Sequence, residues 1–513
     1  MKRGVSKTVI TWDESTCNQC NKCALVCPHA AVRPIVCAAD ADVPDTFKTA
    51  PLKGYKKALV PGDAPRYRMQ ISPLDCLDCG ECILECPKSA LSKTDIDSEV
   101  AQADIANFEW AYKQPYDMAR KLFPEPSKTL KASQFQQPLF EFSGACAGCQ
   151  QTPYLKLLTQ LFGDQMSIGI AVGCVLVYSH LIPLLAYSKH KDGSGIPTAT
   201  SLFEDLGEFG LGITIGARVR RAQLKASAEA VVAAGCDAPL KTALEGWLAV
   251  YDDRVKSFDA SKLVKGALPA SDEGNTDIGQ LISSQDLFAK RSSWIVGGDG
   301  WAYDIGFGGL MHILASGDDI NVMIFDNEMY ANTGGQLSKA SVRGTVQKCA
   351  WAGVPGGKRD LAGMIISGHL GGVYVANVAM GANQMQTLKA MREAEAFPGP
   401  AVVIGFSPCV LQGIAKHLSM KDAHCLAVES GMWPLFRYNP LLRAQGKNPL
   451  SIDSKIKRPI SDYVSTQVRF NALKVTNPER AAANEALLEA DVKARWATLR
   501  GVDSQFVKDE AEQ

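Results

Sequence analysis

The chain has 513 residues, of which 46% are hydrophobic and 21% are charged, with 54 basic and 54 acidic side chains. This composition excludes a disordered chain and predicts a globular protein of several domains. Because the charges cancel, bulk charge favours neither nucleic acid nor an anionic membrane surface as a partner. No apolar stretch reaches the roughly 18–20 residues of a membrane span, and the first residues lack the apolar core of a secretion signal.

Sixteen cysteines are the most informative residues of the chain. Two runs share one spacing, namely Cys17-x-x-Cys20-x-x-Cys23-x-x-x-Cys27-Pro28 and Cys76-x-x-Cys79-x-x-Cys82-x-x-x-Cys86-Pro87. This spacing is typical of two-cluster bacterial ferredoxins, in which the fourth cysteine of each run binds the other cluster. It predicts one [4Fe–4S] cluster on Cys17, Cys20, Cys23 and Cys86, and a second on Cys76, Cys79, Cys82 and Cys27. Eight thiolates could also fill two structural zinc sites, but the doubled pattern is not zinc-like. Thiolates spaced for metals predict a reducing compartment, either the cytoplasm or the reducing lumen of an anaerobic organelle.

The amino-terminal part divides into a domain and an arm. We expect a two-cluster ferredoxin domain of the α+β class over 1–105 and a connecting arm over 106–140. A stretch at about 38–70, rich in Pro, Ala, Asp and Lys, reads as an insertion between the two cysteine runs. It is either a disordered linker or a segment that packs on the surface of a partner domain through its apolar residues, which are Tyr55, Leu59, Val60, Tyr67 and Met69.

The rest of the chain has the pattern of an α/β domain. From about 141 to 455, apolar strands alternate with helices, which predicts a mainly parallel sheet covered by helices. The expected strands are 166–172, 293–297, 320–326, 372–378 and 401–406. The remainder, 456–513, is expected to be a helical tail at the surface.

Two strand ends carry the ligand types of a magnesium site. Gly298-Asp299-Gly300 follows one expected strand, and Asn327 ends the next. The carboxyl ends of neighbouring parallel strands meet at one edge, where α/β sheets bind ligands. Mg²⁺ prefers octahedral oxygen ligation. The pattern therefore predicts a diphosphate-bound Mg²⁺ held by Asp299, Asn327 and the backbone carbonyl of Met329. Gly-Asp-Gly alone is also a common turn, but its spacing to Asn327 and the strand–helix–strand context favour the ion site.

A third set of cysteines lies around the same sheet edge. Cys146-x-x-Cys149 precedes the sheet, Cys174 ends the first expected strand, and Cys409 follows the last. From spacing alone, these four residues could hold a cluster, form a redox disulfide or be buried structural thiols.

Several longer motifs resemble one enzyme family. They are Cys27-Pro-His-Ala-Ala31, the run from Phe142 to Cys149, Ser201-Leu-Phe-Glu-Asp205, the run from Gly298 to Gly309, Asn332-Thr-Gly-Gly-Gln336 and Ser407-Pro-Cys409. Together they resemble the carboxyl-terminal part of pyruvate:ferredoxin (flavodoxin) oxidoreductases, over nearly the whole chain. The resemblance implies thiamine diphosphate as a cofactor, beside a third [4Fe–4S] cluster on Cys146, Cys149, Cys174 and Cys409.

The resemblance also implies roles for individual residues. The cofactor would contact Gln151, Cys174, Gly298, Asp299, Gly300, Asp304, Asn327 and Asn332. Asn332 and Thr333 would be catalytic, near the thiazolium and the substrate. The reaction would be CoA-dependent oxidative decarboxylation of a 2-oxoacid, with electrons passing through three clusters to ferredoxin or flavodoxin.

The family's domains that bind the aminopyrimidine, recognise the 2-oxoacid and contribute to CoA binding are not matched. The glutamate that activates thiamine at N1′ comes from that missing part. Either a second chain completes the site in an oligomer, which we expect, or the polypeptide cannot turn over. A methionine just ahead of the ferredoxin domain favours a true subunit.

The chain departs from the family pattern near the expected thiamine pocket. Gln151 replaces a glutamate, the segment 175–177 is bulkier and more apolar, and Thr200 and Leu206-Gly207 replace asparagine-containing sequence. Two functions therefore stay open. One is a subunit of a 2-oxoacid oxidoreductase, with pyruvate as the expected substrate; the other is an electron-relay or structural subunit with an inert thiamine site.

Overall fold

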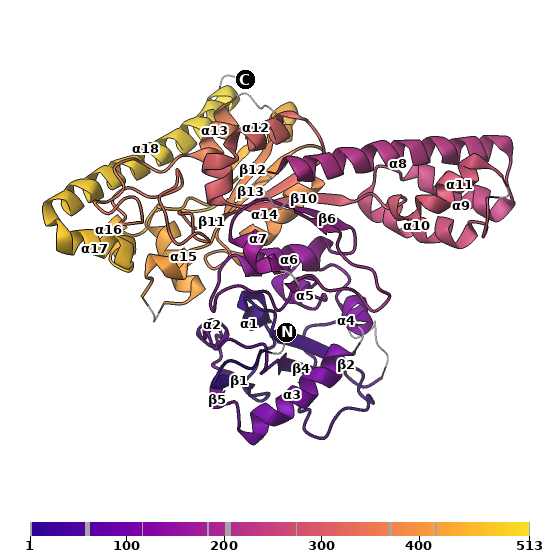
Figure 1. The fold of residues 1–513 in the computed structure, drawn as a ribbon, viewed down its shortest axis with the longest axis horizontal. Helices are drawn as coiled ribbons and strands as arrows, with labels where there is room; N and C mark the ends of the chain where they lie inside the picture. The colour runs from indigo at the N-terminus through magenta and orange to yellow at the C-terminus, as the bar shows by residue number, and fades with distance from the viewer. Residues whose placement is uncertain are drawn as a thin grey trace.

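The computed structural model describes residues 3–56, 62–114, 116–181, 184–200, 207–272, 274–368, 372–415 and 418–511. Leu59, Val60, Leu206 and the motif at 201–205 lie outside these ranges. Figure 1 shows three parts: a small amino-terminal unit, a domain built on a central sheet, and a long helical projection from that domain. In the described ranges, no helix is long and apolar enough to cross a membrane.

The amino-terminal unit has an internal pseudo-twofold repeat around its two cysteine runs. Strand β1 (Thr8–Trp12) pairs antiparallel with β5 (Leu91–Asp95), and β2 (Val32–Cys37) pairs antiparallel with β4 (Arg66–Ile71). The short helices α1 (Lys22–Val26) and α2 (Glu81–Leu84) each carry the third cysteine of a run. Left-handed backbone recurs at equivalent positions of the two runs, at Gln19 and Asp78, Asn21 and Gly80, and Ala30 and Ser89.

The expected insertion belongs largely to this unit. Tyr67 and Met69 lie in β4 and are buried in the unit's own core, so they do not pack on a separate domain. Strand β3 (Ala50–Pro51) pairs with β4, and the ring of Phe47 packs 4.7 Å from that of Trp110. The described part of the segment is therefore ordered against the unit because it supplies apolar side chains to it.

The expected connecting arm is helical and covers the unit. It contains the second half of α3 (Glu99–Tyr112), then α4 (Asp117–Leu122) and α5 (Leu130–Gln134). Helix α4 packs on β2, whereas α5 packs on α1 and on α6 (Thr152–Phe162), the first helix of the sheet domain.

The central sheet has the order β15-β14-β12-β13-β11-β10-β6-β9. All five expected strands are confirmed, as β6 (Met166–Ile170), β10 (Ser292–Gly298), β11 (Asn321–Asp326), β12 (Tyr374–Val378) and β13 (Ala401–Phe406). These five strands and β9 (Thr198–Ala199) are parallel to their neighbours in that group. Two antiparallel strands, β14 (Phe436–Tyr438) and β15 (Leu450–Ile452), extend the edge beyond β12.

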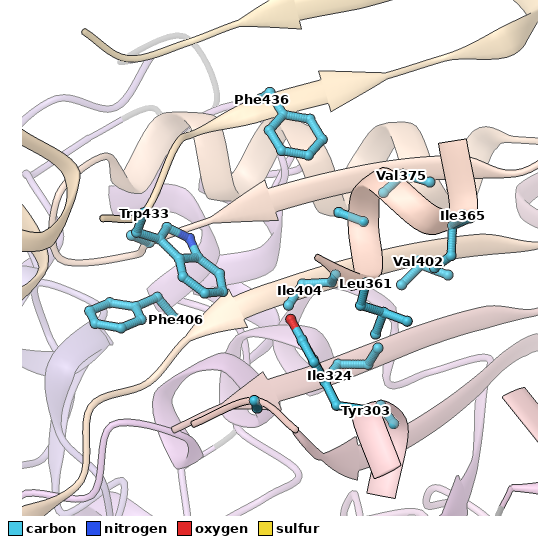
Figure 2. Close-up of a cluster of buried hydrophobic side chains, with 14 of the residues drawn as sticks. Tyr303, Ile324, Leu361, Ile365, Val375, Val402, Ile404, Phe406, Trp433 and Phe436 are labelled. Atoms are coloured by element: carbon cyan, nitrogen blue, oxygen red, sulfur yellow. The ribbon is translucent and has the colours of Figure 1, made fainter. Parts of the chain in front are cut away.

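Helices cover both faces of the sheet. On one face lie α12 (Phe307–Ala315), α13 (Leu361–Ser367) and α15 (Met420–Glu429). Figure 2 shows Leu361 and Ile365 of α13 among side chains of the central strands. On the other face lie α6 and α14 (Gln384–Ala396).

The expected tail is helical but is also part of the core. It forms α16 (Ile460–Val464), α17 (Val468–Thr476) and the long α18 (Pro478–Ala511). Leu488, Val492 and Trp496 of α18 are buried in the same apolar cluster as the sheet. The tail therefore stabilises the sheet domain, although its outer face is exposed.

The helical projection interrupts the expected strand–helix alternation. It consists of α8 (Glu208–Ala234), α9 (Ala238–Ala249), α10 (Arg254–Ala267) and α11 (Thr276–Ser283). Figure 1 shows these helices extending away from the sheet. They bury an apolar cluster of their own, centred on Trp247, whose indole N–H donates to the carbonyl of Phe288 at 2.7 Å.

We expect Trp247→Ala to unfold the projection locally while leaving the sheet domain intact. Loss of this buried side chain should cost about 3–5 kcal/mol, because it leaves a cavity in a small core. Hydrogen exchange should show faster exchange confined to 208–287. Leu263→Ala is the control, since Leu263 is 69% exposed on α10 and should change stability by less than about 0.5 kcal/mol. Equal exchange in both variants would contradict a separate core.

Candidate cofactor and cluster sites

A cavity of about 250 Å³ lies where β6, β10 and β11 end. It is lined by most of the residues expected at the thiamine site, which are Gln151, Cys174, Gly298, Asp299, Gly300, Asn327, Met329, Asn332 and Thr333. Parallel strands bring these residues together because their carboxyl ends share one edge of the sheet.

Two glycines allow the chain segments that line the cavity to pack closely together. A Cβ at Gly300 would lie 2.4 Å from the ring of Tyr330, which is closer than side chains can approach. Gly173 has φ +133°, and a Cβ there would lie 3.0 Å from the backbone nitrogen of Gly298. Only glycine fits where the two chain segments approach so closely.

Three oxygen-bearing groups converge at the predicted magnesium site. One terminus of the Asn327 side-chain amide lies 2.8 Å from the Met329 carbonyl oxygen and 3.1 Å from Oδ1 of Asp299. The other terminus lies 2.8 Å from Nε2 of Gln151. Asp299 also accepts a hydrogen bond from the backbone N–H of Met329 at 2.9 Å.

These contacts fit a cation held by oxygens. Without an ion, the Asn327 amide is best satisfied with its nitrogen toward Asp299 and Met329. A cation would require the opposite orientation, with the amide oxygen beside the two other oxygens. The Asn327 nitrogen would then need an acceptor, and Gln151 has one to offer, because its buried Oε1 has no hydrogen-bond partner among the described residues.

A buried ion network holds the loop that carries these ligands. Glu328 lies between Asn327 and Met329 and has φ +66°, an uncommon conformation for this residue type. Its carboxylate pairs with Arg469 of α17 and with Lys358 at 3.3 Å. Lys358 also lies 2.8 Å from the carboxylate of Asp326.

The charges in this network and the burial of its carboxyl groups shift the pKa values of these groups. Burial raises the pKa of Asp299, and the nearby carboxylate of Asp326 raises it further. Burial also acts to raise the pKa of Glu328, but Lys358 and Arg469 hold it below its ordinary value. Glu328 is therefore the anion that the two buried cations stabilise most directly.

The two predicted catalytic residues lie at the mouth of the cavity. Asn332 and Thr333 are exposed and line it. Thr333 donates a hydrogen bond to Oε1 of Gln336 at 2.5 Å, which closes the loop on itself. Asp304 is not a lining residue; its Oδ2 accepts from the backbone N–H of Lys339 at 3.3 Å. Its role in cofactor binding stays a prediction.

The first cysteine group is assembled as the spacing predicted. Cys17, Cys20, Cys23 and Cys86 line one small cavity. Burial raises the pKa of Cys23, and the other three thiols raise it further, which places all four close together.

The second group is assembled in the same way. Burial raises the pKa of Cys82. The nearby thiols of Cys27, Cys23, Cys79 and Cys76 raise it further. Equivalent backbone N–H groups face one cysteine of each run: Ala31 N–H donates to the sulfur of Cys27, and Ala90 N–H to that of Cys86, both at 3.3 Å. These bonds favour the thiolate, the form that binds metal.

The third group brings together cysteines that are far apart in sequence. Burial raises the pKa of Cys174. The nearby Cys149, Cys409, Cys146 and Asp299 raise it further. Cys174 also lines the 250 Å³ cavity. Across the domain boundary, a Cβ at Gly148 would lie only 3.7 Å from the Cβ of Cys79, so the third group adjoins the second.

The described part of the chain offers no further site for a single metal ion. Among the described residues, no three His, Cys, Asp or Glu side chains converge on one metal ion. The magnesium ligands proposed here include only one such side chain, together with an amide and a backbone carbonyl.

Comparison with known proteins agrees with this geometry. Residues 279–404 match the C-terminal TPP binding domain of thiamine pyrophosphate enzymes, and residues 9–32 match a 4Fe-4S binding domain. The chain contains a thiamine pyrophosphate-binding domain. The matched region begins in α11 and ends in β13, so it includes Asp299, Asn327 and Met329.

Longer relatives extend the match over nearly the whole chain. The pyruvate:ferredoxin oxidoreductase of Moorella thermoacetica is 43% identical over 504 residues, covering 96% of this chain and 42% of that protein. The pyruvate-flavodoxin oxidoreductase of Klebsiella pneumoniae is 41% identical, over 97% of this chain and 42% of that protein. The mitochondrial pyruvate dehydrogenase [NADP(+)] of Euglena gracilis is 38% identical over 97% of this chain and 27% of that protein. The chain thus spans less than half the length of these relatives.

Sequence reasoning missed the residues that support the ligand loop. Glu328 stands between two predicted ligands and could have been suspected from its position. Lys358 and Arg469 carry no local signal, because they approach Glu328 only through the tertiary fold.

We expect Arg469→Gln to destabilise the thiamine pyrophosphate-binding domain by about 3–5 kcal/mol, because it leaves the buried Glu328 carboxylate with one cation instead of two. Thermal unfolding should show a lowered Tm. Arg458→Gln is the matched control. Arg458 pairs with Glu429 but is 51% exposed, so its loss should cost at most about 1 kcal/mol. Similar Tm values for the two variants would show that the buried pair does not support the loop.

Proposed function

We propose that this chain is the thiamine- and cluster-bearing part of a CoA-dependent 2-oxoacid oxidoreductase, with pyruvate as the substrate and ferredoxin or flavodoxin as the acceptor. One observation carries the proposal. Cys174 belongs both to the lining of the cavity and to the third cysteine group, so a cofactor in the cavity would share a wall with a cluster.

The residues around the cavity have distinct tasks in this proposal. Asp299, Asn327 and the Met329 carbonyl hold Mg²⁺, which neutralises the diphosphate. Gly173 and Gly300 let the segments that carry these residues approach one another closely. Asn332 and Thr333 orient the substrate at the mouth. Thiamine diphosphate, when bound, supplies the carbanion chemistry that lets a 2-oxoacid lose CO₂.

The three cysteine groups define the direction of electron flow. The group with Cys174 is nearest the cavity, and the group with Cys79 adjoins it. The group with Cys17 and Cys20 follows as the exit, since Cys23 of this group lies near Cys82 of the second group. Electrons then leave singly toward the acceptor protein, in a reducing compartment.

A partner chain completes the site in this proposal. The relatives are more than twice as long as this chain, which supports the need for further domains. Large apolar side chains are exposed near the cavity, with Ile305 at 50%, Val410 at 55% and Leu411 at 52%. Ile305 lines the cavity directly, so a second chain seated there would cover both the cofactor and these side chains.

A relay without decarboxylation is the second candidate. Gln151 favours it, because a neutral amide stands beside Asn327 where the resemblance expects a carboxylate. The intact cation ligands favour the enzyme, since a relay would have no use for a diphosphate site.

We expect Asp299→Ala to abolish retention of thiamine diphosphate and Mg²⁺, because the diphosphate loses the one carboxylate that anchors its ion. Equilibrium dialysis of the chain with both ligands would measure this. Asp319→Ala is the control, since Asp319 is a partly exposed carboxylate that pairs with Lys290 at 2.8 Å, away from the cavity. Equal binding by the two variants would remove Asp299 from the site.

The activity test requires the assembled protein. Alone, the chain should be inactive with pyruvate and CoA; with the partner chain, purified under argon, it should release CO₂ and reduce a low-potential dye. Gln151→Glu separates the two candidates. An inactive assembly that this substitution activates is a relay, whereas an assembly active with Gln151 is the enzyme. Inactivity of both forms with every 2-oxoacid would reject decarboxylation.

A further inference from the structure

Lys156 is a buried cation without a carboxylate partner. It lies on α6 of the sheet domain, is 2% exposed, and reaches into the amino-terminal unit. Its ammonium donates to the carbonyl of Ala24 and, at 2.9 Å, to the carbonyl of Cys27. No ion pair found in the described ranges involves Lys156.

Such a charge is costly unless an anion lies nearby. Transferring an ammonium from water to a protein interior costs several kcal/mol, and two neutral carbonyls offset only part of that cost. Nearby Arg33 shows the usual solution, because its buried guanidinium pairs with the carboxylate of Glu141. Lys156 has no such carboxylate beside it among the described residues. Its buried positive charge therefore requires another anion nearby.

The cysteine groups supply that anion. The ammonium of Lys156 donates to the backbone carbonyl of Cys27, a predicted ligand of the second group. It also donates to the backbone carbonyl of Ala24, the residue that follows Cys23 of the first group. A cube bound by four thiolates is anionic and becomes more so on reduction, and nearby charge is one of the factors that set its potential.

We propose that Lys156 is the counter-charge of the two clusters in the amino-terminal unit, and that it raises the reduction potential of the cluster on Cys27, Cys76, Cys79 and Cys82 more than that of the cluster on Cys17, Cys20, Cys23 and Cys86. A fixed positive charge stabilises the reduced form, which carries one more electron. This cluster adjoins the group at the thiamine cavity, so Lys156 favours withdrawal of each electron from that group. The inference rests on the clusters of the proposed function.

Redox titration of the anaerobically purified chain, followed by electron paramagnetic resonance, tests this role. Lys156→Gln removes the charge but keeps a donor for the carbonyls. It should lower the potential of the cluster nearer Cys27 by about 59 mV or more, equivalent to about a tenfold change in the one-electron equilibrium. Lys156→Arg keeps the charge and should restore most of the difference. An unchanged potential in Lys156→Gln with full iron content would overturn the proposal.

Lys22→Met is the matched control, because Lys22 lies beside the first group but is 36% exposed and pairs with Glu85 at 3.7 Å. Its effect should be smaller and should fade as salt is added, whereas the effect of Lys156 should persist, since salt screens exposed charges far more than buried ones. Equal salt dependence would contradict a buried counter-charge.

Iron content separates failure of this inference from failure of the proposed function. The wild-type chain should hold about twelve irons, four in each cube. Wild-type protein without iron would reject the clusters themselves. If Lys156→Gln and Lys156→Met lose clusters that Lys156→Arg retains, the charge is required for assembly, which supports the proposal. Loss of clusters from all three variants would instead assign Lys156 a packing role and overturn it.

Discussion

The candidate site depends on one constraint: parallel strands of a sheet end at the same edge. Strands β6, β10, β11 and β13 end side by side, so Cys174, Asp299, Asn327 and Cys409 meet although they are far apart in sequence. Their polar side chains are then forced into a largely buried region, where charges need partners. Lys358 and Arg469 meet this need for Asp326 and Glu328, and the carboxyl-terminal helices thereby support the ligand loop.

Helix α6 mechanically links the cofactor edge to the amino-terminal unit. Gln151 precedes it and contacts Asn327, and the hydroxyl of Tyr154 donates to the carbonyl of Phe406 at 2.9 Å, at the end of β13. Two residues further along the helix, the ammonium of Lys156 donates to the backbone carbonyl of Cys27 in the unit. A second link is the contact of the His29 ring nitrogen with the Ala145 carbonyl at 3.0 Å. The helix therefore fixes the spacing between the cavity and the cysteine groups.

Parts of the molecule differ in how completely their apolar side chains are covered. The sheet is covered by helices on both faces, and the tail is packed against it. The cavity edge, in contrast, carries exposed Ile305, Val410 and Leu411. The helical projection adds a separate core, and it is anchored to the sheet domain where α8 packs on β6 and β10.

The sequence by itself determined the elements whose chemistry is local. Cysteine spacing assigned the members of the first two groups, because the fourth cysteine of each run is directed away by the proline that follows it. Apolar runs identified the five central strands, and the residues that follow them marked the cofactor edge. For the third group, spacing alone left a cluster, a disulfide and buried thiols open, and only the resemblance implied its members; the tertiary structure brings them together because the strands before Cys174 and Cys409 end at one edge of the sheet. Only the tertiary structure decided the partners of Glu328, the burial of Lys156, the place of Tyr67 and Met69 in β4, and the projection α8–α11. These features depend on contacts between segments that are distant in sequence. No local pattern of residues predicts such contacts.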